Sequence, residues 1–158
     1  MLSFMPATEQ DIPALCDLLT ILFTQESEFK PDEMAQRKGL AAIMGHPEVG
    51  VILVARGSTG IVAMVNLLFT VSTALGERVA LLEDMVVAPA ARGQGAGSGL
   101  LAHAVEHAQA LGIRRITLLT DEGNHEAQRF YARHGFQSSS MRPMRWVMGQ
   151  DLDGNGSV

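Results

Sequence analysis

Residues 79–99 read VALLEDMVVAPAARGQGAGSG, and this stretch decides the fold. Its first nine residues are mostly apolar and predict a strand over 79–87. Glycines then recur at alternate positions from 93 to 99, which lets the backbone turn tightly and approach a ligand without an intervening Cβ. A helix is expected from about residue 97 to 111, closed by Gly112. A glycine loop that opens a helix favours an anion such as phosphate, and a flexible strand-to-helix connection is the alternative interpretation.

The flanking sequence predicts further helices and strands. Apolar residues at helical spacing favour helices over about 9–24 and 31–44, the first preceded by a capping-box-like Thr8-Glu9-Gln10-Asp11. A second group of segments follows strand or short-helix patterns: strands at 2–5, 51–55, 61–69 and 116–120, a helix over 124–134 closed by Gly135, and one or two weaker strands within 136–148.

This order of elements predicts an α/β (α+β) fold class with a mixed sheet. Three strands form a meander, and a right-handed crossover over 79–120 joins two parallel strands. In this interpretation residues 1–148 are a single domain and residues 149–158 are a flexible C-terminal tail.

Composition excludes several classes of protein. The chain has 158 residues, of which 47% are hydrophobic and 18% charged, so a sizeable core is expected and disorder is not. The net charge of −5 argues against nucleic acid or an anionic membrane as partner and is compatible with a cationic small molecule. A single cysteine, Cys16, expected to be a small buried residue, excludes an internal disulfide. With no membrane-spanning run and no signal peptide seen in the sequence, a cytoplasmic location is expected.

Two nucleotide-binding patterns do not fit the glycine loop. A P-loop needs a Lys-Ser/Thr pair after its last glycine, and none is present. The dinucleotide pattern G-x-G-x-x-G also fails, because Ser98 and Leu100 stand where its third glycine would fall.

A different family fits the loop. The segment Arg92-Gly93-Gln94-Gly95-Ala96-Gly97 resembles the Q/R-x-x-G-x-G/A signature of the GNAT acyltransferases, which bind acetyl-CoA. Farther along, Asn124-His125-Glu126-Ala127-Gln128-Arg129-Phe130-Tyr131, followed by Gly135-Phe136, resembles the family's N-x-x-A-x-x-F-Y…G-F segment. The resemblance implies a GNAT-like fold over nearly the whole chain: a mixed, largely antiparallel sheet with one splayed parallel pair, and helices on both faces.

The resemblance also implies acetyl-CoA as co-substrate and a set of residues that bind it. The loop around Gly93 would hold the pyrophosphate with the backbone N–H groups of Gln94, Gly95, Ala96, Gly97 and Ser98, with the Arg92 side chain near the phosphates. Met85, Val86 and Val87 would run beside the pantetheine arm, to which Asn124 would hydrogen-bond. A purely structural interpretation is that Met85, Val86 and Val87 belong to the strand core and that Asn124 is a helix N-cap. For Asn124, capping and ligand binding are compatible.

Acetyl transfer to an amine needs a proton acceptor. Glu83 and Asp84 are candidates, because both lie in the middle of a strand where a structural role favours an apolar residue. Alternation along a regular strand sends them to opposite faces, so only one would face the cleft. The segment from Leu82 to Val87 resembles a strand of the diamine and polyamine acetyltransferases, which favours Glu83 acting through water and leaves Asp84 as a substrate-binding residue. A carboxylate paired with a cation is the structural alternative.

The reaction also needs stabilised charge on the thioester oxygen and a proton for the leaving thiolate. A backbone N–H near Val86 or Val87 would serve the oxygen. Tyr131, the single tyrosine, matches the family's general acid. The alternative for Tyr131 is an amphipathic residue at a helix end.

The acceptor predicted from this resemblance is a small primary amine. Glu26 and Glu28, between the first two helices, would attract a second positive charge on a diamine or polyamine, although a solvated loop is the commoner role of such residues. The sequence therefore predicts an acetyl-CoA-dependent N-acetyltransferase that works by direct attack in a ternary complex, with a homodimer suggested by the family. The alternatives are acetylation of a protein N-terminus or lysine, and a non-catalytic acyl-CoA-binding regulatory module.

No metal is expected. His103-Ala104-Val105-Glu106-His107 matches a zinc motif, but helical spacing places both histidines beside or outside the buried face, and no third ligand is near in sequence. Residues 151–156 copy the first half of a calcium loop, and the chain ends before the twelfth position that such a loop requires.

Overall fold

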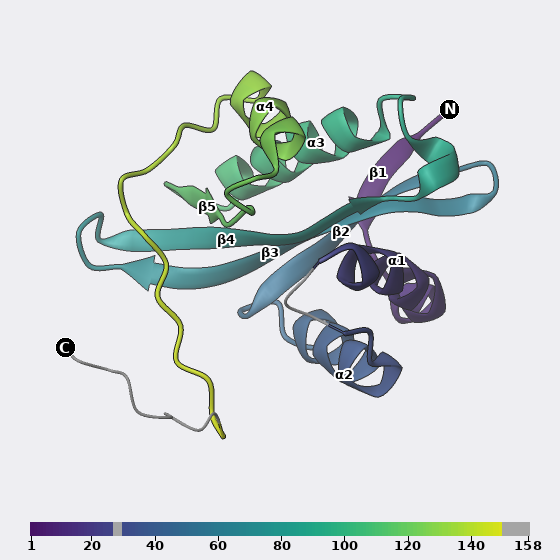
Figure 1. The fold of residues 1–158 in the computed structure, drawn as a ribbon, viewed down its shortest axis with the longest axis horizontal. Helices are drawn as coiled ribbons and strands as arrows, with labels where there is room; N and C mark the ends of the chain where they lie inside the picture. Colours follow the sequence, from purple (N-terminus) through teal and green to yellow (C-terminus); the bar gives the residue numbers. More distant parts are fainter. Residues whose placement is uncertain (27–29, 150–158) are drawn as a thin grey trace.

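The computed structural model describes residues 1–26 and 30–149. Figure 1 shows the elements, and their bounds in chain order are β1 (Ser3–Pro6), the 3₁₀ turn η1 (Glu9–Asp11), α1 (Ile12–Gln25), α2 (Glu33–Met44), β2 (Gly50–Gly57), β3 (Gly60–Ser72), β4 (Glu77–Val87), the 3₁₀ turn η2 (Pro89–Ala91), α3 (Ala96–Ala110), β5 (Ile116–Leu118) and α4 (His125–Arg133). Each helix and strand expected up to residue 134 is therefore present. Glu28 and residues 150–158 of the expected tail lie outside the described residues.

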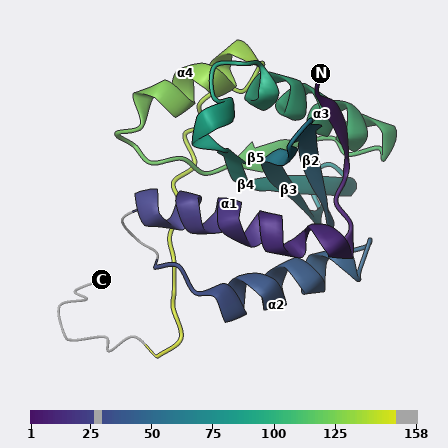
Figure 2. The same ribbon diagram turned by 90° about the vertical axis from the view of Figure 1, so that its right-hand side faces the viewer.

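The sheet has the strand order β1-β2-β3-β4-β5. The first three pairings are antiparallel, and β4 pairs with β5 in parallel. Figure 2 shows α1 and α2 on one face of the sheet and α3 and α4 on the other. The predicted fold class, a mixed sheet with one parallel pair and helices on both faces, is confirmed.

Two hydrophobic cores lie on the two faces of the sheet. Leu53 and Ala55 of β2 pack in the core under α3, which includes Leu100 and Leu101. Ile52 and Val54, which alternate with them along β2, pack in the core under α1 and α2. The continuous apolar run at 51–55 thus predicted correctly a strand buried on both sides.

A bulge interrupts β4. Asn66 of β3 pairs with Glu83, and Met64 pairs with Val86. One residue of β3 between these pairs therefore lies opposite two residues of β4. Asp84 in the bulge has φ of 55°, a left-handed conformation that is uncommon outside glycine. The expectation that simple alternation places Glu83 and Asp84 on opposite faces assumed a regular strand, and the bulge removes that regularity.

The parallel pairing ends just before the bulge. β5 pairs with β4 only at Ala80, Leu81 and Leu82, whereas β4 continues to Val87. The last part of β4 is therefore unpaired on its β5 side among the described residues. This free edge is compatible with the splayed pair that the family resemblance implied.

The expectation of strands within 136–148 is wrong. Residues 135–149 contain no helix or strand, and their backbone makes no hydrogen bond to the rest of the described backbone after Phe136. Pro143 lacks the N–H that a ladder needs, and Met144 and Trp146 are 95% and 74% exposed, so nothing buries the apolar side chains that suggested a strand. Figure 1 shows this C-terminal arm leaving α4 and running away from the body. In the described part of the chain, no helix is long and apolar enough to cross a membrane.

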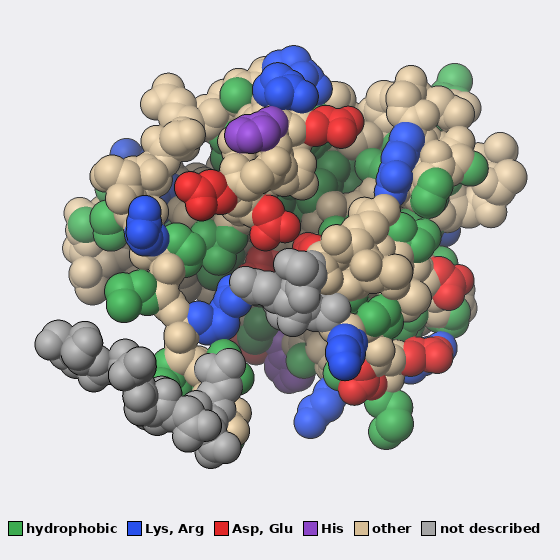
Figure 3. Space-filling model, viewed as in Figure 1, with side chains coloured by type: hydrophobic (Ala, Val, Ile, Leu, Met, Phe, Trp, Pro, Cys, Tyr) green, Lys and Arg blue, Asp and Glu red, His purple; other side chains and the backbone are tan. Residues whose placement is uncertain are grey.

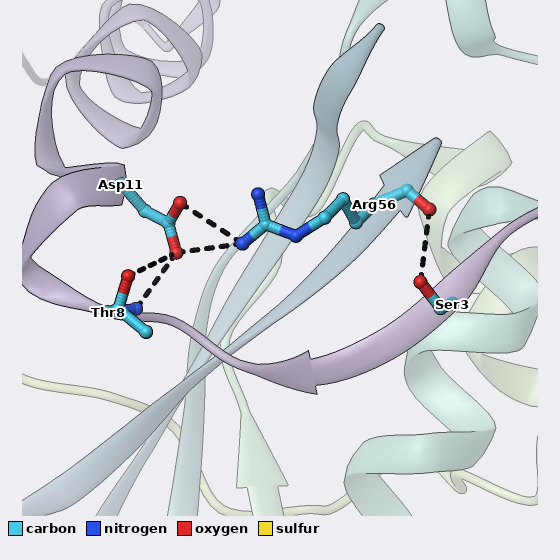
Figure 4. A network of polar contacts seen from close by, with 4 residues as sticks. All are labelled: Ser3, Thr8, Asp11 and Arg56. Carbon is cyan, nitrogen blue, oxygen red and sulfur yellow. Dashed lines mark hydrogen bonds and ion pairs between the residues drawn. The ribbon is translucent and has the colours of Figure 1, made fainter. Parts of the chain in front are cut away.

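A polar network ties the start of the chain to β2 (Figure 4). The Thr8 N–H donates to Asp11 at 2.8 Å, as the capping-box pattern predicted, and the Arg56 guanidinium donates to both oxygens of the same carboxylate at 3.1 and 3.0 Å. Burial raises the pKa of Asp11, but the Thr8 amide and the Arg56 guanidinium outweigh it and hold the pKa below its usual value of 3.8.

This network predicts a pH-dependent stability. Because the folded pKa of Asp11 is lowered, its contribution is present above about pH 4 and is lost as the pH falls through the folded value. Arg56→Met should lower the free energy of unfolding in urea by about 1–2 kcal/mol at pH 7, and this loss should shrink as the pH falls below about 4. Arg37→Met, which breaks the exposed Arg37–Glu33 pair, is the matched control and should cost under about 0.5 kcal/mol. An equal loss in both variants would contradict the role given to Asp11.

Candidate active site

The glycine loop forms an open group of backbone amides at the start of α3. Gly93 and Gly95 have φ of 78° and 84°, a conformation that glycine adopts without a steric penalty. Gly95 is the N-cap, and the Gly99 N–H donates to its carbonyl at 2.9 Å. The N–H groups of the preceding helical residues, Ala96 to Ser98, therefore have no partner within the helix. The loop from Arg92 to Gly95 is exposed, so an anion can reach these amides.

Side-chain hydrogen bonds hold the loop in place. Arg92 Nε donates to the Val87 carbonyl at 3.2 Å, and Gln94 Nε2 donates to the Ala90 carbonyl at 3.3 Å. Ser98 Oγ lies 3.2 Å from His134 Nε2 at the end of α4. The loop is thus attached to β4, to η2 and to α4, which orders it before a ligand arrives.

Gly97 marks where β4, α3 and α4 meet. A Cβ there would lie 3.4 Å from Val87 Cγ2, 3.7 Å from Phe130 Cζ and 3.8 Å from Met85 Cε. The sequence-predicted residues Met85 and Val87 thus lie beside the amide loop, whereas Val86 packs in the core on the opposite face. Gly99 has a packing role of its own, because the Phe4 ring of β1 lies where its Cβ would be.

Tyr131 lies next to this junction on α4. Its half-buried ring packs edge-on against Phe130 and Phe136, with ring centroids 5.2 and 5.7 Å apart. Burial raises the pKa of Tyr131 to about 12, so the hydroxyl is protonated at neutral pH. Asn124 caps α4 by accepting from the Ala127 N–H at 3.1 Å, which confirms its structural role. Because this bond occupies the side-chain oxygen of Asn124, the side-chain nitrogen is the group left to bind a ligand.

A second opening lies on the other face of the sheet, between α1, α2 and the strands β3 and β4. It is a pocket of about 300 Å³ with mostly apolar walls and a few polar groups, lined by Leu19, Phe23, Lys30, Asp32, Ala35, Gln36, Gly39, Leu40, Ile43, Asn66 and Asp84. Figure 3 shows several Asp and Glu side chains near the middle of the face seen in Figure 1.

Asp84 lies in the wall of this pocket. The pKa of Asp84 is raised to about 6, chiefly by burial and also by the nearby carboxylates of Glu83 and Glu26, while a hydrogen bond from Asn66 acts in the opposite direction. Glu26 lies near enough for its charge to raise the pKa of Asp84, but it is not among the residues that line the pocket. Glu83 is exposed and does not line the pocket. The sequence left open which of the two carboxylates faces the cleft, and the bulge turns Asp84 toward the pocket.

Sequence reasoning missed Asn66, Lys30 and Gln36, which also line the pocket. Asn66 is 2% exposed, and its signal was a single polar residue inside the apolar run at 61–69. No comparable signal marked Lys30 or Gln36, because polar residues around a helix start are common. Cys16 is buried, as expected, and is not among the residues that line this pocket.

In the ranges 1–26 and 30–149, no three His, Cys, Asp or Glu side chains are grouped to hold a metal ion. His103 instead stacks on the Phe4 ring, with ring centroids 6.0 Å apart.

Comparison with known proteins defines the class. Residues 12–136 match the acetyltransferase (GNAT) family, and the chain belongs to this family. It is an enzyme, an N-acetyltransferase, and enzymes of this fold use acetyl-CoA.

Particular relatives support this assignment. The chain is 32% identical over 136 residues to the aminoalkylphosphonate N-acetyltransferase of Salmonella typhimurium, a match that covers 86% of this chain and 85% of the relative. An acetyltransferase of Trypanosoma brucei is similar in structure, with a TM-score of 0.73 and 27% identity over 94% of this chain and 100% of the other. A predicted acetyltransferase of Clostridium acetobutylicum, solved with acetyl-CoA, has the same fold, with a TM-score of 0.75 and 19% identity over 96% and 99% of the two chains.

Proposed function

We propose that this enzyme transfers the acetyl group of acetyl-CoA to a primary amine of a small molecule, by direct attack in a ternary complex. The observation that carries the proposal is the position of β4. Its unpaired end, from Asp84 to Val87, has the amide loop of α3 beside one face and the pocket under α1 and α2 on the other. A thioester bound from one side can therefore meet an amine bound from the other.

The acetyl-CoA side is proposed on the residues that the family signature marked. The N–H groups from Gln94 to Ser98 would bind the pyrophosphate, with Arg92 and Gly93 shaping the loop. Met85, Val86 and Val87 would offer the free backbone edge of β4 to the pantetheine arm. The amide nitrogen of Asn124 would contact the same arm.

The chemical roles follow from charge and position. The Tyr131 hydroxyl would give its proton to the leaving thiolate. A backbone N–H near Val86 or Val87 would stabilise the negative charge on the thioester oxygen. Exposed Glu83 would take the proton of the amine through water, and Asp84 would hold the ammonium group in the pocket.

The acceptor class is narrowed by the charges in the pocket. Asp84, the nearby Glu26 and the rim residue Asp32 favour a diamine or polyamine, which carries two or more positive charges. Lys30 in the same pocket favours a second candidate, an amine that also carries an acidic group. The Salmonella relative is named for such compounds, the aminoalkylphosphonates.

A panel of acceptors tests this proposal. Release of CoA from acetyl-CoA should be measured with diamines, polyamines, aminoalkylphosphonates, amino acids and peptides with free N-termini or lysines. We expect turnover with the free small amines and little with peptides. Turnover with peptides alone would overturn the small-molecule assignment. Binding of acetyl-CoA with no turnover on any acceptor would favour a regulatory acyl-CoA-binding module.

A further inference from the structure

Asn66 and Asp84 form a buried polar pair in the wall of the acceptor pocket. Asn66 Nδ2 donates to Asp84 Oδ2 at 2.7 Å. The other end of the same amide, Oδ1, is shut off from solvent and has no hydrogen-bond partner among the residues that the structure describes. Asn66 is only 2% exposed, so this oxygen is an unsatisfied acceptor inside the protein.

An unsatisfied carbonyl oxygen and an incompletely solvated carboxylate are both costly to bury. Both groups accept hydrogen bonds, and they lie side by side in one pocket. A bound group that supplies two N–H donors and a positive charge would satisfy both at once. The pair thus differs from Gln36 in the same pocket, whose amide is satisfied at both ends by Cys16 and Asp32.

We infer that Asn66 and Asp84 together bind the ammonium group of the acceptor, with Asn66 Oδ1 and the Asp84 carboxylate each accepting one N–H. This inference rests on the proposed function and adds to it a binding residue, Asn66, and a requirement on the acceptor nitrogen. The nitrogen needs at least two N–H bonds when it is charged, a condition that primary amines meet and quaternary ammonium groups do not.

The Asn66 amide keeps its Nδ2 on Asp84 Oδ2, so the acceptors left for a ligand are Asn66 Oδ1 and the second oxygen of the Asp84 carboxylate. An ammonium group that donates one N–H to each of these oxygens leaves the hydrogen bond between Asn66 and Asp84 intact.

Competition between two ligands that differ only in their N–H groups tests the pair. A short alkylamine and its N,N,N-trimethyl analogue should be compared as inhibitors of wild type, Asn66→Leu and Thr70→Leu, the last at an exposed position of β3 outside the pocket. Both ligands keep the charge attraction to Asp84, and only the first can donate N–H bonds to Asp84 and Asn66. Wild type should prefer the alkylamine by about 10-fold or more, as expected for a hydrogen bond to a charged group. Asn66→Leu should lose the part of that preference that Asn66 supplies, and Thr70→Leu should keep all of it.

A pH measurement adds an independent readout. The groups around Asp84 are Glu83 on β4, Glu26 after α1, Asn66 on β3, and Lys30 and Asp32 at the start of α2. Affinity for the alkylamine should fall at acid pH as Asp84 is protonated, which gives the pH profile an acid limb. The Asn66 hydrogen bond lowers the pKa of Asp84, so its removal should move this acid limb to higher pH. Thr70→Leu should leave that limb in place. Asn66→Thr keeps an oxygen on a strand-favouring side chain and should retain part of the preference, which covers the case that Asn66→Leu does not fold.

Two failures are distinguishable. If folded Asn66→Leu keeps the wild-type preference and pH limb while wild type binds acetyl-CoA and acetylates amines, the inference is wrong and the proposed function stands. If wild type neither binds acetyl-CoA by calorimetry nor acetylates any amine, the proposed function is wrong, and the inference falls with it.

Discussion

Tyr131→Phe is expected to lower the turnover number by about 10²-fold or more, because general acid catalysis typically contributes this much. The variant removes one hydroxyl and keeps the ring that packs on Phe130 and Phe136. The measurement is CoA release under saturating acetyl-CoA with the best acceptor from the panel.

The control for this variant is the affinity for acetyl-CoA, which calorimetry should find within about twofold of wild type. Because burial raises the pKa of Tyr131 to about 12, the hydroxyl stays protonated up to about pH 10. At any pH up to that value, the wild-type rate should show no decrease caused by loss of this proton. Unchanged turnover in Tyr131→Phe would remove the general acid from the proposal.

Gly95→Val is expected to weaken acetyl-CoA binding by about 10²-fold. Gly95 has φ of 84°, and a β-branched residue in that conformation is strained by about 1–3 kcal/mol. No atom lies within 4 Å of a Cβ built at Gly95, so the cost arises from the backbone alone. Relief of the strain would rotate the peptide units at the start of α3 and turn their N–H groups away from a bound pyrophosphate.

Gly76→Val is a matched control for this variant. Gly76 lies in the turn between β3 and β4, has φ of 69°, and also has no atom near a Cβ. The two variants should lower the melting temperature by similar amounts, while Gly76→Val keeps acetyl-CoA affinity. Equal affinities in both variants would show that the amide loop does not bind the co-substrate.

Local sequence signals predicted most of the fold. The apolar run at 51–55 predicted a doubly buried strand, the capping box at Thr8 predicted a helix start, and Gly112 and Gly135 predicted helix ends, where they have φ of 77° and 91°. Each of these signals acts within a few residues, which is why it is visible without the structure.

The features that sequence reasoning missed depend on distant residues. The bulge at Asp84 follows from the register of β4 against β3, and a sequence pattern with period two does not contain it. Asn66 gains its meaning only because it lies beside Asp84, 18 positions away. In the C-terminal arm, the apolar residues from 137 to 149 make no backbone hydrogen bond to a strand, so the local pattern alone predicted wrongly.

The exposed arm has a practical consequence for spectroscopy. Trp146 is the single tryptophan of the sequence, and it is 74% exposed on a segment without backbone pairing. Its emission should already resemble that of a solvated indole in the native state, so fluorescence should change little when the two cores unfold. Circular dichroism near 222 nm or calorimetry should therefore report the cooperative unfolding transition, to which the fluorescence of Trp146 is insensitive.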